Sequence, residues 1–137
     1  MSTPALHPFA AHYRVLYARL ASTEEQRQML AELLDSVGRG CAAAGAALIG
    51  HIKAFAVQPG GGYLAGSLTS ASAPSQVEAR DLQASQQLDV DLAALVYGLE
   101  REQLAQIVDQ AWQALAEMGL IRSARLLVDH PEGLPDP

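Results

Sequence analysis

Two polar side chains, His51 and Lys53, interrupt an otherwise apolar segment, residues 47–57. If this segment is a strand, both side chains lie on the same face, two residues apart. A lysine ammonium beside an imidazole suits a small anionic ligand. Because an unpaired lysine is costly to bury, the alternative is that Lys53 pairs with an acid such as Asp89 or Glu78, or extends into solvent. We therefore take His51 and Lys53 as candidate ligand-binding residues and assign no catalytic residue.

Asp89 and Asp91 form a second pattern, because they alternate with Leu88, Val90 and Leu92. This alternation predicts a half-buried strand with both carboxylates on one face. Such a pair could bind a hard cation or share a proton. The other interpretation, which we favour, is the solvated face of an amphipathic strand.

The remaining chemistry-bearing residues are sparse. Cys41 is the only cysteine, so it can form neither an internal disulfide nor a cysteine zinc site. We predict a small core residue rather than a nucleophile, which would need a lowered pKa. The four histidines show no metal-ligand spacing. The sequence thus predicts no metal and no cofactor.

Two glycine-rich segments could suggest phosphate binding. The pattern G-x-G-x-x-A over 38–43 follows a predicted helix, whereas a dinucleotide loop follows a strand. The segment QPGGG over 58–62 precedes a strand-like stretch rather than a helix, so we predict a hairpin turn. Whether residues 41–50 are helix or strand is left open by their composition.

Hydrophobic spacing predicts an α+β fold. It consists of an antiparallel sheet of about four strands, with two N-terminal helices and one long C-terminal helix packed on it. Pro8 and helical spacing of apolar residues predict the first helix, the capping box Ser22–Glu25 predicts the second, and a continuous apolar stripe predicts the third. We expect this third helix to be the main cover of the sheet. The residues Leu104, Val108 and Leu115 of its apolar stripe should therefore be buried against the strands. The predicted helices are 8–21, 22–37 and 100–118, and the predicted strands are 47–57, 63–70 and 88–97, with shorter ones at 77–82 and 121–129.

Length and charge narrow the class of protein. A chain of 137 residues suits a single domain over 1–137, with flexible tails at 1–7 and 130–137. The formal net charge is −6, and the acidic excess lies in the second half, which argues against binding nucleic acid or an anionic membrane. No apolar run is long enough for a membrane span, and the first residues lack a signal-peptide pattern. We expect a soluble cytoplasmic protein.

Residues 88–129 resemble the end of the alkaline-shock envelope domain. There too, an alternating strand that ends in Tyr-Gly, here within Leu88–Gly98, leads to an amphipathic helix and a short strand. The predicted N-terminal helices and the QPGGG turn have no counterpart in that domain. The resemblance therefore implies no functional role for any residue.

These observations favour a non-catalytic domain that acts through self-association or by binding a protein partner. Segment 47–57 is apolar on both faces, so a second chain would be needed to cover one of them. We expect a homo-oligomer, with a dimer as the simplest form. The alternatives are a small anionic ligand-binding protein or enzyme that uses His51 and Lys53, and a peripheral membrane adaptor, which the acidic excess disfavours.

Overall fold

The structure, a computed structural model, describes residues 8–130 and contains six strands and two helices over that range. The predicted tails at 1–7 and 130–137 lie outside the described residues, except for His130, which ends β6. In chain order the elements are β1 (Phe9–Ala21), α1 (Thr23–Ala43), β2 (Leu48–Val57), β3 (Tyr63–Leu68), β4 (Gln76–Arg80), β5 (Ser85–Tyr97), α2 (Arg101–Glu117) and β6 (Ile121–His130).

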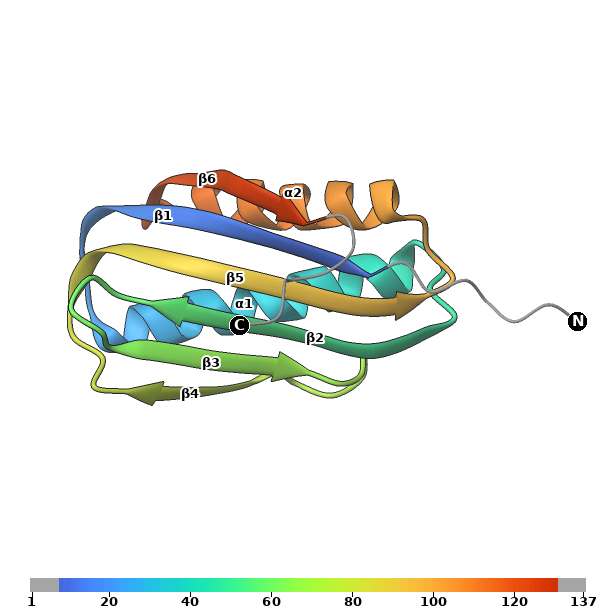
Figure 1. Ribbon diagram of the computed structural model, residues 1–137, viewed down its shortest axis with the longest axis horizontal. Coiled ribbons are helices and arrows are strands. Elements are labelled where there is room, and N and C mark those ends of the chain that lie inside the picture. Colours follow the sequence, from blue (N-terminus) through green and yellow to red (C-terminus); the bar gives the residue numbers. More distant parts are fainter. Residues whose placement is uncertain (1–7, 131–137) are drawn as a thin grey trace, which may run out of the picture.

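The six strands form one antiparallel sheet in the order β4-β3-β2-β5-β1-β6 (Figure 1). Two β-α-β units interlock in it: β5 lies between β1 and β2, which α1 connects, and β1 lies between β5 and β6, which α2 connects. This is the split β-α-β arrangement, extended beyond β2 by the hairpin β3–β4. The two central strands, β5 and β1, therefore come from distant parts of the sequence.

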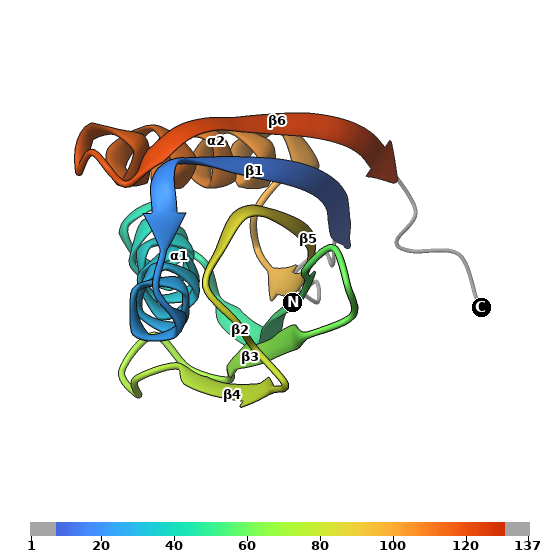
Figure 2. The ribbon, with the colours of Figure 1, turned by 90° about the vertical axis from the view of Figure 1, so that its left-hand side faces the viewer.

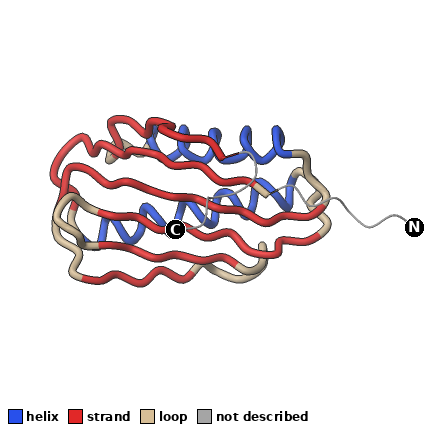
Figure 3. Tube along the Cα trace, in the orientation of Figure 1, coloured by secondary structure: helices blue, strands red, loops and turns tan. Residues whose placement is uncertain are grey.

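Both helices cover the same face of the sheet (Figures 2 and 3). The helices contact each other, α1 packs on β2, β3 and β4, and α2 packs on β6 and β1. Alternate strand residues point toward them, so one apolar cluster fills the space between the layers. Its fully buried members include Leu30, Leu33 and Leu34 of α1, Leu104 and Val108 of α2, and Val15, Ile52, Leu88, Val90 and Leu92 of the strands.

The predicted four-strand sheet with three helices is wrong, because residues 9–21 form a strand. The helical spacing of Phe9, Tyr13, Leu16 and Leu20 is coincidental. In the structure Phe9 and Tyr13 are buried, whereas Leu20 is 59% exposed. The residues that point to the core alternate with a period of two, as a strand requires.

The predicted helix end at Gly38 is also wrong, since α1 continues to Ala43. Both glycines in its last turns allow close packing rather than a turn. A Cβ on Gly38 would lie 2.3 Å from Leu68 Cδ2, and one on Gly40 would lie 2.6 Å from Ile107 Cγ2. Residues 41–50 are thus helix up to Ala43 and strand from Leu48.

Several predicted elements are confirmed. Ser22 and Glu25 form the capping box of α1, and Gly60 and Gly61 take positive φ in the turn between β2 and β3. The residues Leu104, Val108 and Leu115 are buried, as predicted, but α2 is not the main cover, because α1 is the longer helix and lies over three strands. None of the helices described is long and apolar enough to cross a membrane.

Candidate functional site: the open face of the sheet

The face of the sheet opposite the helices, here called the open face, has no described helix packed on it. The face of β2 that carries His51 and Lys53 is therefore not covered by any element within residues 8–130. Cross-strand pairing places the side chains of adjacent strands on this face in rows. The open face carries His12, Arg14, Asp89, Asp91, His51, Lys53, Phe55, Val57, Tyr63, Ala65, Glu78 and Arg80.

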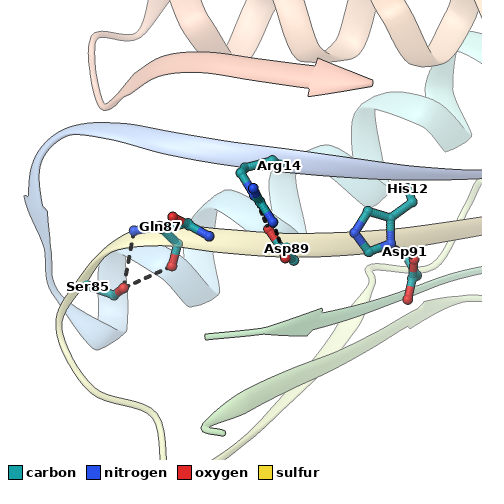
Figure 4. A network of polar contacts seen from close by, with 6 residues as sticks. All are labelled: His12, Arg14, Ser85, Gln87, Asp89 and Asp91. Carbon is teal, nitrogen blue, oxygen red and sulfur yellow. Dashed lines mark hydrogen bonds and ion pairs between the residues drawn. The ribbon is translucent and has the colours of Figure 1, made fainter. Parts of the chain in front are cut away.

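A basic stripe and an acidic stripe run along the middle of the open face (Figure 4). On β1, His12 and Arg14 form the basic stripe; on β5, Asp91 and Asp89 form the acidic stripe, each residue opposite its partner. Arg14 donates to both carboxylate oxygens of Asp89, at 3.0 and 3.2 Å. His12 Nδ1 pairs with the carboxylate of Asp91. Each carboxylate is thus matched by one β1 side chain.

The charge of Arg14 changes the acidity of its partner. Its hydrogen bond to Asp89, aided by its charge and that of His12, lowers the pKa of the Asp89 carboxyl below its usual range. Asp89 is therefore ionised at neutral pH. The prediction that Asp89 and Asp91 share a face is confirmed. The sequence does not indicate their partners, because its apolar spacing predicts a helix over 8–21 where the structure has β1.

The structure places the two predicted ligand-binding residues on the open face as well. His51 lies opposite Leu95, and Lys53 lies between Ala93 and Ser67. Burial, aided by the charge of Lys53, lowers the pKa of His51. Lys53 is exposed and forms no ion pair with any described residue, so the expected pairing with an acid is not found.

An aromatic pair lies beside the charged stripes. The rings of Phe55 and Tyr63 are 5.2 Å apart, between β2 and β3. Phe55 is 44% exposed, and Val57 is its neighbour on the same face. Exposed aromatic area is typical of protein-binding surfaces. The open face thus combines a small apolar area with internally matched charges.

A cavity of about 380 Å³ lies between α1, the end of α2 and the start of β6, where Arg19 and Glu25 form an ion pair on its rim. Neither His51 nor Lys53 lines it. Among the described residues no group of three or more His, Cys, Asp or Glu side chains could hold a metal ion.

Cys41 lies in the core on α1, as predicted. Burial raises the pKa of its thiol to about 11, so about one molecule in a thousand carries a thiolate at pH 8. We expect the native thiol to resist an aromatic disulfide reagent at pH 8. In guanidinium chloride, one thiol per chain should react.

The measurement is absorbance at the wavelength of the released thiolate, with free glutathione as the control for reagent activity. Complete modification of the native protein within the time that glutathione needs would contradict an unreactive Cys41.

Comparison with known protein families, curated proteins and solved structures finds no match to this chain. The resemblance of residues 88–129 to the alkaline-shock envelope domain therefore has no support from a family match. The functional argument depends on the geometry alone.

Proposed function

We propose that the protein is a non-catalytic interaction module that binds a second copy of itself through the open face. The observation that carries this proposal is the pair of stripes, basic on β1 and acidic on β5. Such a pattern is complementary to its own image, as a symmetric dimer interface must be.

The proposed dimer has a two-fold axis parallel to the strands, which lies above the open face midway between β1 and β5. It places β1 of each copy over β5 of the other, as two sheets packed face to face and nearly aligned. Arg14 then lies over Asp89 of the second copy, and His12 over Asp91. Because each charge already has a partner within its own chain, it does not enter the interface unpaired.

The size of the open face suits this contact. In this arrangement β2, β5, β1 and β6 lie over strands of the second copy, whereas β3 and β4 extend beyond its edge. Four strands at a spacing of about 4.8 Å, with about 30 Å of strand length, give an area on the order of 600 Å² per copy. Two such faces bury roughly 1,200 Å² in total, which is the lower end of the range for specific protein interfaces. The exposed Phe55 adds an apolar anchor next to the stripes.

The charge of the rest of the molecule favours the same arrangement. Both helices carry more acidic than basic side chains, and the whole chain has a net charge of −6. Face-to-face packing keeps the acidic helix layers on the outside of the dimer, far from each other. A nucleic acid is not proposed as a partner, because Asp89 and Asp91 lie at the centre of the face.

The alternative, a small anionic ligand bound by His51 and Lys53, stays a prediction. Both side chains lie on the open face, and neither lines the cavity of about 380 Å³ beside α1. Small-molecule sites are usually concave.

With its single thiol in the core, the chain suits a reducing compartment, so we place it in the cytoplasm.

Sedimentation equilibrium of Arg14→Glu tests the proposal. In a dimer of this geometry, the variant replaces two attractions by two repulsions, so we expect its dissociation constant to rise about tenfold or more. The matched control is Arg39→Glu, which makes the same charge change on α1, where Arg39 pairs with Glu32 on the helix surface. A wild-type protein that stays monomeric at about 100 μM, or equal weakening by both variants, would overturn the proposal.

A charge swap sharpens the test. The double variant Arg14→Asp with Asp89→Arg keeps the pair within each chain, and it keeps complementary stripes between two identical copies. We expect it to dimerise with itself like wild type but to exchange poorly with labelled wild type in a fluorescence energy-transfer assay. Free exchange would show that Arg14 and Asp89 do not face each other across the interface.

A further inference from the structure

We propose that the cavity between α1, the end of α2 and the start of β6, here called the α1–α2 groove, binds a cationic amphipathic helix of a partner protein. The groove has a volume of about 380 Å³ and is open on its solvent side. It can therefore receive side chains of a partner surface without enclosing a small molecule. Its apolar lining consists of Met29, Leu115, Met118, Leu120 and Ile121.

The lining residues of α1 give the groove its direction. Glu25, Gln28, Met29 and Glu32 are spaced i, i+3, i+4 and i+7, so they form one stripe along two turns of α1. At a rise of about 1.5 Å per residue, this stripe is about 10 Å long. A helix that lies alongside α1 would meet the stripe with side chains at the same spacing, which is how amphipathic helices bind grooves.

Met118 supplies an apolar contact that such a helix would cover. Its side chain is 73% exposed, whereas Met29 and Leu115 beside it are buried. Methionine is unbranched, so it adapts to the shape of a partner. Covering one exposed methionine side chain favours binding by a factor of roughly ten or more.

The charge around the groove is acidic. The helix α1 carries four acidic and two basic side chains, and α2 carries three and one. Both carboxylate oxygens of Glu25 accept hydrogen bonds from Arg19. In Glu32, by contrast, only Oε1 accepts hydrogen bonds from described residues, namely Ser36 and Arg39. The Oε2 atom of Glu32 is therefore available for a cation of the partner.

The end of α2 at the groove adds to the preference for a cation. The C-terminus of a helix carries a partial negative charge, and the last turn of α2 has no basic residue to offset it. Glu117, which is exposed in this turn, adds a full negative charge. A lysine or arginine next to the apolar side chains of the partner would supply the missing positive charge, whereas an acidic helix would be repelled.

The α1–α2 groove lies on the helix side of the sheet, opposite the open face. A dimer formed through the open face would carry two such grooves on its outer layers. The inference goes beyond self-association and does not depend on it, because its test measures peptide binding to either the monomer or the dimer. Failure of one proposal therefore does not decide the other.

Fluorescence anisotropy of a labelled model peptide provides the test. The peptide is a helix of about 15 residues that contains only leucine and lysine, with the leucines on one face. Its counterpart has glutamate in place of lysine. At about 0.15 M salt, which screens distant charges, we expect saturable binding of the lysine peptide and none of the glutamate peptide. Saturable binding of neither peptide, or equal binding of both, would overturn the proposal.

Met118→Gln separates the groove from the general charge of the helix layer. We expect it to weaken binding of the lysine peptide about tenfold, because it removes apolar contact but changes no charge. The matched control is Leu48→Gln, at an exposed apolar position of β2 that does not line the groove, and it should bind like wild type. Equal affinity of Met118→Gln and wild type would show that charge alone holds the peptide, which would overturn the groove as its site.

Glu32→Gln tests the contact to the cation. We expect it to weaken binding of the lysine peptide about two- to fivefold, as the loss of one exposed charge pair does. The matched control is Glu102→Gln, which makes the same change at an exposed position in the first turn of α2, away from the groove. An equal loss in both variants would mean that the peptide responds to the net charge of the protein, and it would contradict binding at the groove.

Discussion

Replacing Leu104 by alanine is expected to lower the free energy of unfolding by about 2–5 kcal/mol. Leu104 lies in the first turns of α2 and is fully buried in the cluster between the helices and the sheet. The change removes apolar area and leaves a cavity, and both effects act in the same direction. Urea denaturation followed by circular dichroism measures the loss.

The control for this prediction is Leu48→Ala, which makes the same chemical change at the start of β2, where Leu48 is 61% exposed. We expect a change within about 0.5 kcal/mol there. A loss below about 1 kcal/mol for Leu104→Ala would mean that α2 is not packed on the sheet as described.

Gln26→Leu is expected to destabilise the protein by about 2–4 kcal/mol, although leucine is the more apolar residue. The amide of Gln26 is fully buried. Its Nε2 donates to the carbonyls of Ala21, at 3.2 Å, and Gln83, at 2.9 Å, and its Oε1 accepts from Gln58 Nε2 at 3.0 Å. Leucine would remove these three hydrogen bonds from the core, and Gln58 Nε2 and the Gln83 carbonyl would keep only the hydrogen bond between them.

The matched control is Gln28→Leu, two residues further along α1, where the side chain is exposed. Its effect on urea denaturation should stay within about 0.5 kcal/mol. If the urea midpoint of unfolding of Gln26→Leu equals or exceeds that of the wild type, the buried amides are not needed to join α1 to the turns at Gln58 and Gln83.

The sequence predicts an element correctly where its hydrophobic periodicity and its end residues indicate the same type of secondary structure. In α2 the apolar stripe has one period throughout, and Gly119 takes the positive φ expected after the helix. The turn QPGGG correctly placed the hairpin of β2 and β3. In β1, alanines and aromatic residues match both periods, so local pattern could not choose between them.

The candidate site could not be predicted in full, because it depends on how strands from distant parts of the sequence pair with each other. That Asp89 and Asp91 share a face follows from alternation alone. That Arg14 and His12 are their partners follows only from the register between β1 and β5. The buried Gln26 and Gln58 had no signal either, because glutamine is usually exposed. The charge pattern of the open face becomes visible only when β1 is placed as a central strand.

The position of β1 also has a consequence for synthesis of the chain. Arg14 and Asp89 are 75 residues apart in sequence, yet they belong to adjacent strands. At about 5–20 residues added per second, β1 waits about 4–15 s for β5 to be made. During that time the apolar side of β1, from Phe9 to Tyr17, has no sheet neighbour on either edge, since β6 follows later still. Folding of this topology is therefore governed by late, long-range pairing, and the nascent chain is most exposed to aggregation before residue 97 has left the ribosome.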